Sequence, residues 1–528
     1  MKLPIGIQSF ESLRKDGYLY IDKTELVYSL INQGRYYFLS RPRRFGKSLL
    51  ISTIKAVFEG KRELFKGLAI DSKEDFDWTP RPILHLDLNT NKYDKADVLT
   101  DKLNKSLEDW EKLYDCARPD LPHGMRLENV IQAAREKTGH RVVILVDEYD
   151  KPMLQAIGNE TLQKEYRATL KGFYGALKSM DECIKFAMLT GVTKFGKVSV
   201  FSDLNNLMDI SMLPRYHDIC GITEKELLSV FDKQIDGLAG DNGLSREDCI
   251  AKLKKMYDGY HFDEFSKHGI YNPFSVLNTF NSNIFRSYWF ETGTPTYLVE
   301  LLRKHHYDLE RMAHADVTSD ILNSIDAESS NPIPVIYQSG YLTIKGYKER
   351  FKKYVLGFPN EEVEEGFIKY LAPFYLDNQS KRSEFDVEAF SEDVEQGNPE
   401  QFCMRLKSLL ASAPYDMELD NEGNYRNVIW VIFKMMGFYS QCEYKTSDGR
   451  IDLLIETPDY RYVIEFLLGQ ASQSAERKLD GTAEQALQQI KDKQYLLPFT
   501  LDSKKTYMVG INFAKEQRTI EKYLIEEA

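Results

Sequence analysis

One stretch near the start of the chain constrains the fold more than any other: RYYFLSRPRRFGKSLLISTIKAVF, residues 35–58. Its short apolar run, Tyr36 to Leu39, predicts a buried strand. A turn rich in Arg and Pro follows, and then Gly46-Lys47-Ser48 opens an apolar helix. In such a strand–turn–helix context, backbone N–H groups and the helix N-terminus can bind phosphate. The stretch therefore predicts a phosphate-binding loop.

The residue types in this loop have defined tasks. Lys47 would contact the β- and γ-phosphates, and the Ser48 hydroxyl would bind Mg²⁺. Arg43 and Arg44 would add positive charge near the phosphates. The glycine that usually stands five residues before the Gly-Lys pair is replaced by Arg41. Because Gly-Lys-Ser is common by chance, a basic turn that caps a helix is the alternative interpretation.

A second stretch, RVVILVDEYDKP at residues 141–152, supports the phosphate-binding interpretation. Five apolar residues, Val142 to Val146, predict a parallel strand that is covered on both faces. Asp147 and Glu148 follow at its carboxyl end, where parallel sheets bind ligands. Asp147 would hold Mg²⁺ through water, and Glu148 would polarise the attacking water. A strand that ends in a solvated acidic turn is the alternative.

The segment after this acidic strand predicts a further strand, KFAMLTGV at residues 185–192. Some ATPases insert a strand between the phosphate-loop strand and the acidic strand and place a polar sensor at its end. Thr190 or Thr193 would then contact the γ-phosphate or the water, and a turn hydroxyl without a role is the alternative.

A fifth short strand is predicted over residues 217–223. NKYD at residues 91–94 precedes the acidic strand, so it predicts a solvated turn and not a guanine-reading motif.

Length and composition exclude several classes of protein. The 528 residues suffice for roughly two to four domains. The net charge of −12 and the pI of about 5.5 argue against a protein that coats DNA, although a local basic groove is compatible with them. Six scattered cysteines without a CxxC pair favour reduced thiols over disulfides or a zinc site. No apolar run reaches membrane-spanning length, and we expect a cytoplasmic protein without a membrane partner.

The motifs RPRRFGKSLL, VDEYDKP, TGVTKF and GITEKEL together resemble the bacterial AAA-ATPase-like family, which is close to archaeal and STAND-type P-loop ATPases. Later segments such as MYDGYHF (256–262) and YQSGYLTIKGY (337–347) fit the same family, so the resemblance covers most of the chain. In that family the loop typically reads RPRRFGKS, which implies that the missing glycine is a family trait. The resemblance also implies ATP in preference to GTP, together with Mg²⁺.

Family members often carry a PD-(D/E)XK nuclease-like domain, and residues 444–466 fit one. They predict two strands around a turn, with Asp452 and Glu465 at the spacing of an Asp…Glu-x-Lys motif. In that motif the two acids hold Mg²⁺, and the lysine activates water or stabilises phosphate. Here position 467 is Leu, and residues 467–477 resemble an insertion before Lys478.

Two outcomes of this insertion are open. If it loops out, Lys478 returns to the catalytic position; if Leu467 continues the strand, the amine is lost. We favour an impaired nuclease. Gln489 and Lys491 on the next helix would still line a groove for DNA or RNA.

The resulting prediction is an α/β protein: a P-loop NTPase parallel sheet with a helical lid, plus a C-terminal α/β nuclease-like domain. The predicted parts are a P-loop domain (1–223), a helical lid (224–335), a connecting α+β region with a β-hairpin (336–410) and the nuclease-like domain (411–528). We expect Mg²⁺-dependent ATP hydrolysis coupled to a nuclease-like domain with an interrupted motif. Two alternatives are an active nucleotide-gated nuclease and a non-hydrolysing switch that binds nucleic acid or protein. A homo-oligomer is compatible with the sequence.

Overall fold

The computed structural model describes residues 2–194, 206–289, 302, 309–322, 331–375, 382–411, 422–435, 439–445, 449–469, 482–500, 502–514 and 519–528. The chain divides into two compact units: Met1–Leu298 with His314–Glu364, and Val299–Ala313 with Glu365–Ala528. Each unit has its own five-stranded sheet and its own apolar core. The finer division into four parts stays a prediction.

The first unit is built on a five-stranded, all-parallel sheet with the order β2-β3-β4-β1-β5. Its strands are β1 Tyr36–Ser40, β2 Ile83–Asp87, β3 Val142–Asp147, β4 Ile184–Gly191 and β5 Met208–Asp209. The strand predicted after the acidic strand lies, as expected, between β1 and β3. Because all pairs are parallel, the carboxyl ends of β1, β3 and β4 meet at one edge of the sheet.

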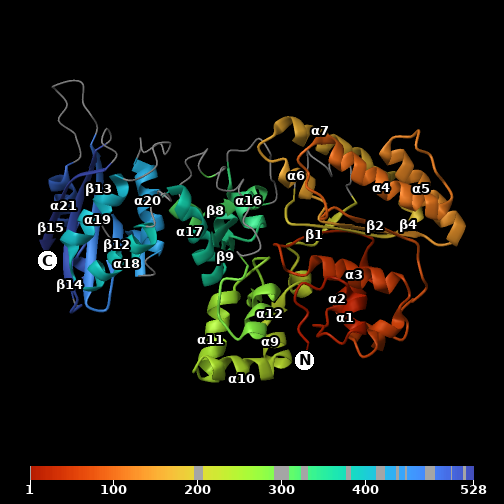
Figure 1. Cartoon of the computed structure of the whole chain (residues 1–528), viewed down its shortest axis with the longest axis horizontal. Coiled ribbons are helices and arrows are strands. Elements are labelled where there is room, and N and C mark those ends of the chain that lie inside the picture. Colours follow the sequence, from red (N-terminus) through yellow and green to blue (C-terminus); the bar gives the residue numbers. More distant parts are fainter. Residues whose placement is uncertain are drawn as a thin grey trace. The chain divides into compact units, whose positions relative to one another are not determined.

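Helices cover both faces of this sheet, which explains why all six residues of β3 are buried. Helices α4, α5 and α7 lie on one face, and α3 lies on the other with α1 and α2 (Figure 1). Their bounds are α1 Phe10–Lys15, α2 Thr24–Gln33, α3 Lys47–Phe58, α4 Ala96–Tyr114, α5 His123–Thr138 and α7 Glu160–Tyr174. Short helices α6 Lys151–Gln155 and α8 Ala176–Ser179 flank α7.

The prediction of a fifth strand over residues 217–223 is wrong for most of these residues. A 3₁₀ helix, Pro214–Ile219, occupies its start, and only β6 Ile222–Thr223 is a strand. This strand pairs with β7 Ile270–Tyr271 in a separate two-stranded sheet. The backbone before β6 is held by side chains instead of a ladder, since the Tyr216 carbonyl accepts a hydrogen bond from Arg41. The fifth strand of the main sheet is β5.

Helices follow β6, as predicted for the lid. They are α9 Glu224–Val230, α10 Asp232–Asp241, α11 Arg246–Tyr257 and α12 Pro273–Ser282. Thr223 and Glu226 form a capping box at the start of α9. The predicted β-hairpin is also present, as β9 Thr343–Lys348 and β10 Lys353–Gly357, and β8 Asp316–Thr318 pairs with β10. Helices α15 Ser319–Leu322 and α16 Ile333–Gln338 precede the hairpin.

The solvated turn predicted at residues 91–94 contains one buried residue. The Tyr93 side chain is fully buried, and its hydroxyl donates to the Leu88 carbonyl at 2.9 Å. Its backbone N–H donates to the Gln155 side chain at 2.6 Å. Tyr93 therefore ties this turn to α6.

The second unit contains a mixed sheet with the order β11-β12-β13-β14-β15, in which only β13 and β14 are parallel. Its strands are β11 Tyr439–Lys445, β12 Arg450–Glu456, β13 Tyr460–Gly469, β14 Lys505–Ala514 and β15 Thr519–Glu527. The parallel pair needs a crossover, and α21 Ala483–Asp492 lies within it and packs on both strands. The other helices are α14 Leu309–Ala313, α18 Arg382–Glu395, α19 Pro399–Ala411 and α20 Glu422–Met435, and α17 Glu361–Tyr375 spans the boundary between the units.

Candidate functional site

The loop between β1 and α3 contains two residues with left-handed backbone, Arg44 and Gly46. Gly46 precedes α3 with a φ of 93°, a left-handed conformation that strongly favours glycine. Arg44 also has a positive φ, 67°. Phe45 between them is buried and anchors the turn. The first turn of α3 therefore begins at the edge of the sheet where the carboxyl ends of β1 and β3 meet.

Lys47 and Glu148, the two catalytic candidates of this region, form an ion pair. Lys47 Nζ lies 3.2 Å from Glu148 Oε1, and the two side chains are 3% and 16% exposed. The same ammonium group donates to the carbonyls of Arg41 and Pro42 at 2.9 and 3.1 Å. Glu148 has a φ of 54°, which is unusual for a residue other than glycine and typical of strained functional positions.

The buried ends of β3 and β4 hold Asp147 and the two sensor candidates. The Thr190 hydroxyl donates to Asp147 Oδ1 at 2.6 Å, and both side chains are buried. The Thr193 hydroxyl donates to Asp150 Oδ2 at 2.6 Å. Each threonine thus holds a carboxylate of the VDEYD segment, an arrangement that orients those acids.

Asp150 is a site residue that the sequence reasoning missed. It is fully buried, and it accepts hydrogen bonds from the backbone N–H groups of Val192 and Thr193 at 3.1 and 2.6 Å. Burial raises the pKa of Asp150, the Glu148 charge raises it further, and the bonds from Thr193 oppose both effects. A Cβ on Gly191 would lie 2.5 Å from Asp150 Oδ1, so this contact needs a glycine. The signal in the sequence was a third acid, three residues after Asp147.

The loop between β1 and α3 and the Glu148 side chain border a cavity of about 430 Å³. Its lining includes the predicted Arg43, Arg44, Gly46, Lys47, Ser48 and Glu148. Asp147 and Thr190 are buried and are not part of the lining. Sequence reasoning missed the N-terminal segment 4–8, Asn89 and Lys151, which also line the cavity. Lys151 donates through Nζ to the Asn89 side chain at 2.8 Å.

A smaller cavity of about 100 Å³ adjoins the first and shares Pro4, Gly46, Leu49, Pro273 and Leu277 with it. Its lining is mainly apolar and includes Leu19, Ile21, Leu50 and Ile222. Lys23 is its charged member, and this lysine forms an ion pair with Glu226 at 2.6 Å. The pair of cavities offers a polar compartment beside an apolar one.

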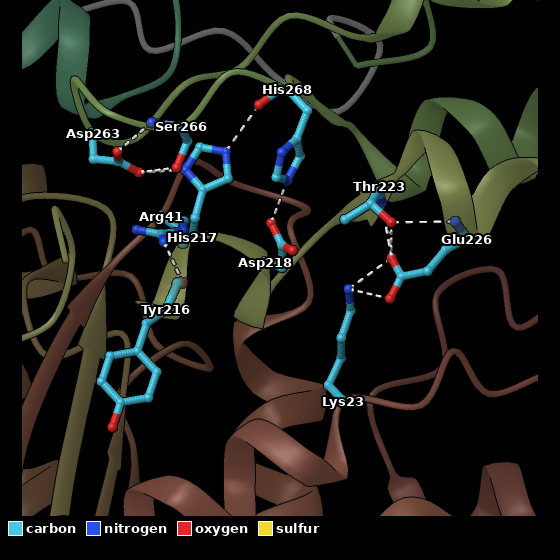
Figure 2. Close-up of polar contacts among 10 residues, drawn as sticks. All are labelled: Lys23, Arg41, Tyr216, His217, Asp218, Thr223, Glu226, Asp263, Ser266 and His268. Atoms are coloured by element: carbon cyan, nitrogen blue, oxygen red, sulfur yellow. Dashed lines mark hydrogen bonds and ion pairs between the residues drawn. The ribbon is translucent and has the colours of Figure 1, made fainter. Parts of the chain in front are cut away.

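Arg41, the residue in place of the usual glycine, does not line the larger cavity. Its guanidinium is buried and donates to the carbonyls of Ser40 and Ser211 at 2.9 and 2.7 Å. The guanidinium also donates to the Tyr216 carbonyl at 3.1 Å (Figure 2). It also lies 3.8 Å from the centre of the Phe262 ring. Burial lowers the pKa of Arg41. Its position indicates a structural role that joins the phosphate loop to the segment after β5.

In the second unit, β12 carries Asp452 and the neighbouring β13 carries Glu465. Asp452 Oδ2 accepts a hydrogen bond from the Phe466 backbone at 2.9 Å. Burial raises the pKa of Glu465, and the adjacent Asp452 carboxyl raises it further. Among the described residues, Glu465 Oε1 is buried without a hydrogen-bond partner. Two adjacent carboxylates with an unsatisfied oxygen fit a divalent cation such as Mg²⁺.

The position of the expected lysine is occupied by Leu467. Strand β13 continues through Leu467 to Gly469, and Leu467 pairs with Asn512 of β14. Lys478 lies outside the residues that the structure describes. On α21, Lys491 forms an ion pair with Glu526 at 2.6 Å, and Gln489 lies close enough to Glu465 to lower its pKa.

Comparisons with known proteins agree with this geometry. Residues 4–201 match the family described as "Predicted AAA-ATPase", and residues 420–523 match the PD-(D/E)XK nuclease superfamily. The chain belongs to the AAA-ATPase-like family of proteins with a C-terminal PD-(D/E)XK domain. It is similar to an "Uncharacterized protein in vnfD 5'region" from Azotobacter chroococcum mcd 1, with 34% identity over 536 residues and 99% of each chain covered. None of the helices in the described ranges is long and apolar enough to span a bilayer.

Proposed function

We propose that the first unit binds Mg·ATP in the cavity of about 430 Å³ and hydrolyses it. The observation that carries this proposal is the Lys47–Glu148 pair at 3.2 Å, at the edge of a parallel sheet and beside the N-terminus of α3. An ammonium group held by backbone carbonyls and one carboxylate can move to a phosphate oxygen, because the phosphate supplies the same negative charge.

Movement of Lys47 to a phosphate would release Glu148. The freed carboxylate would face the cavity, where it can orient a water molecule and accept its proton. Thr190 keeps Asp147 in one orientation throughout, since its hydroxyl is already bonded to Oδ1. Ser48 directly, and Asp147 through water, would hold a magnesium ion, which supplies positive charge beside the phosphates when it is bound. Arg43 and Arg44 would contact the same phosphates from the cavity rim.

The apolar cavity beside Leu49 suits the nucleotide base. Leu19, Ile21 and Ile222 provide flat apolar contact, and the N-terminal segment at Pro4 borders both cavities. A purine base buries largely apolar surface when it binds in such a site. The preference for adenine rests on the family resemblance.

The test is ATP hydrolysis by the full chain with and without Mg²⁺, and with and without DNA. We expect Lys47→Ala to lose ATP binding. Glu148→Gln should retain binding and lose about 10²–10⁴-fold in turnover, the usual contribution of a general base. Lys55→Ala is the matched control, since Lys55 lies on the same helix and pairs only with surface Glu59 among the ion pairs described.

Two results would contradict hydrolysis at this site. Equal turnover by the Lys47 and Glu148 variants and the native chain would place the reaction elsewhere. ATP binding without turnover, unchanged by Glu148→Gln, would favour the alternative of a non-hydrolysing nucleotide switch.

For the second unit we propose a metal-binding, nucleic-acid-binding domain with impaired cleavage. Asp452 and Glu465 supply the two acids, and Leu467 supplies no amine. The experiment is metal-dependent cleavage of DNA and of RNA by the native chain and by Asp452→Ala. Cleavage that is lost in Asp452→Ala and that depends on ATP would instead support the active, nucleotide-gated nuclease.

A further inference from the structure

A cluster of metal-binding side chains lies outside both cavities and both candidate catalytic sites. It consists of His217 and Asp218 in the 3₁₀ helix Pro214–Ile219 and of His268 in the loop before β7 (Figure 2). One ring nitrogen of each histidine and one carboxylate oxygen of Asp218 lie within 4.8 Å of one another. We propose that His217, Asp218 and His268 bind a Zn²⁺ ion.

Asp263 orients His217 for this task. His217 Nδ1 lies 2.6 Å from Asp263 Oδ2. The same carboxylate accepts from the backbone of Phe265 and Ser266 at 2.8 Å each and from the Ser266 hydroxyl at 2.7 Å. Because the Asp263 carboxylate is an acceptor, a hydrogen bond from Nδ1 of His217 leaves Nε2 as the ring nitrogen that can bind a metal ion. Metal-bound histidines are typically held in this way by a carboxylate.

The surroundings of His217 Nε2 call for a cation. This nitrogen lies 3.2 Å from the backbone carbonyl oxygen of His268, which can only accept a hydrogen bond. The His217 and Asp263 side chains are 2% and 1% exposed, so water contributes little. A neutral imidazole would place its lone pair against that oxygen in a buried site. A metal ion bound to Nε2 would satisfy this lone pair, and a hydrogen bond from Nε2–H to the carbonyl is the alternative that the experiment tests.

The remaining ligands are positioned to complete a metal site. His268 Nε2 lies 2.8 Å from Asp218 Oδ1, and the two side chains are 49% and 41% exposed. Zn²⁺ bonds of about 2.0–2.1 Å place tetrahedral ligand atoms about 3.3 Å apart. The partly exposed side chains of His268 and Asp218 can rotate until their ligand atoms reach this spacing, while the buried His217 stays fixed. Two imidazoles and one carboxylate suit Zn²⁺ better than Mg²⁺ or Ca²⁺, which prefer oxygen ligands.

The site adjoins the segment that supports the phosphate loop. Tyr216, which precedes His217, accepts a hydrogen bond from Arg41 at 3.1 Å. His268 belongs to a different segment, the loop that leads into β7. A Zn²⁺ ion would therefore join these two segments next to the anchor of Arg41.

The experiment uses the full, untagged chain without nucleotide, in an Asp452→Asn/Glu465→Gln background that removes the candidate cation site of the second unit. The protein is stripped with a chelator, loaded with Zn²⁺ or Co²⁺, and freed of excess metal by gel filtration. We expect one bound ion per chain and, with Co²⁺, the visible absorption of tetrahedral coordination, which Zn²⁺ then abolishes. Asp218→Asn/His268→Gln should lose both signals, and His140→Gln is the matched control.

Asp263→Asn provides an independent measurement, because it changes the orientation of His217 without removing a ligand. It should weaken Zn²⁺ binding about 10–100-fold, the usual effect of losing such a carboxylate. Circular dichroism checks that each variant is folded. The proposal is overturned if the folded native chain retains no metal, or if the double variant retains as much as the control. His217 would then serve only as a hydrogen-bond partner of Asp263 and of the His268 carbonyl.

Discussion

Arg41 shows how a large, charged arginine can stand where related loops have a glycine. Glycine usually stands at this point of a phosphate loop. A long charged side chain would obstruct the loop only if it pointed to the ligand. Here the guanidinium points away, into a buried site with three carbonyl acceptors and the Phe262 ring. The arginine thus belongs to the support of the loop and not to its phosphate contacts.

This arrangement predicts that Arg41→Gly, which restores the usual pattern, destabilises the protein. The substitution leaves the Ser211 and Tyr216 carbonyls without their donor, and we expect a loss of about 2–4 kcal/mol in the free energy of unfolding. Urea unfolding of the nucleotide-free chain measures it. Arg43→Ala, an exposed change in the same loop, should stay within about 0.5 kcal/mol of the native chain. Equal stability of Arg41→Gly and the native chain would refute the supporting role.

Glu465 predicts a dependence of stability on pH in the metal-free protein. Burial and Asp452 raise the pKa of Glu465 in the folded state above its unfolded value. Its contribution to stability is therefore complete below the unfolded pKa and is lost as the pH rises toward the folded pKa. The loss amounts to at most about 1.4 kcal/mol for each pH unit in that interval.

Glu465→Gln cannot ionise, so it should lack this loss. Thermal unfolding with a chelator should show the variant and the native chain converging at acidic pH and the variant becoming the more stable at alkaline pH. Mg²⁺ should stabilise only the native chain. Parallel pH profiles for the two proteins would show that the Glu465 carboxyl does not keep its proton on folding.

At the scale of elements, the length of strand β13 determines which residue occupies the lysine position of the nuclease motif. The strand does not end at Glu465 but runs on through Leu467 to Gly469, in register with β14. Continuous pairing fixes the direction of residue 467, because side chains alternate along a strand and residues 465 and 467 share one face. A lysine at position 467 would therefore share the face of the sheet that carries Glu465.

Leu467→Lys should consequently create or increase metal-dependent cleavage of nucleic acid. We expect a gain of at least about 10-fold, below the full effect of a well-placed acid–base group. Plasmid nicking with Mg²⁺ or Mn²⁺ measures it, and Asp452→Ala in the same background should abolish it. If the native chain already cleaves and Lys478→Ala stops it, then Lys478 and not residue 467 supplies the amine.

At the scale of the whole molecule, the two compact units have separate cores and separate candidate ligands. A ligand that binds one folded unit stabilises that unit by mass action, by about 2.7 kcal/mol at a concentration 100 times its dissociation constant. Mg·ATP should therefore raise the unfolding temperature of the unit that contains Lys47.

Calorimetry together with hydrogen exchange can assign this effect. We expect slower exchange in peptides from α3 and β3 when Mg·ATP is present, and unchanged exchange in peptides from β12 and β13. Lys47→Ala should remove the effect in the first unit. An equal shift in both units would show that they unfold as one cooperative body.

Much of this architecture was predictable from local pattern. The apolar runs of β1, β3 and β4, the glycine before α3 and the acids after β3 are short-range signals, so the loop and the acidic end of β3 could be expected. The ion pair between Lys47 and Glu148 was not predicted. The partners of Asp150 could not, because they come from the end of β4, more than forty residues later. The N-terminal segment at Pro4 carries no motif, and only folding brings it to the cavity.

The sequence by itself determined which segments form the parallel sheet and which residue types meet at its edge, because strand burial and loop glycines act over a few residues. Only the tertiary structure decided where Arg41 points, that the segment before β6 forms a 3₁₀ helix, that β13 runs through Leu467, and that His217 meets Asp263 and His268. These features depend on contacts between residues far apart in the chain. The residues that contact a buried charge or a strand end determine where it lies, and only the packed fold brings those residues together.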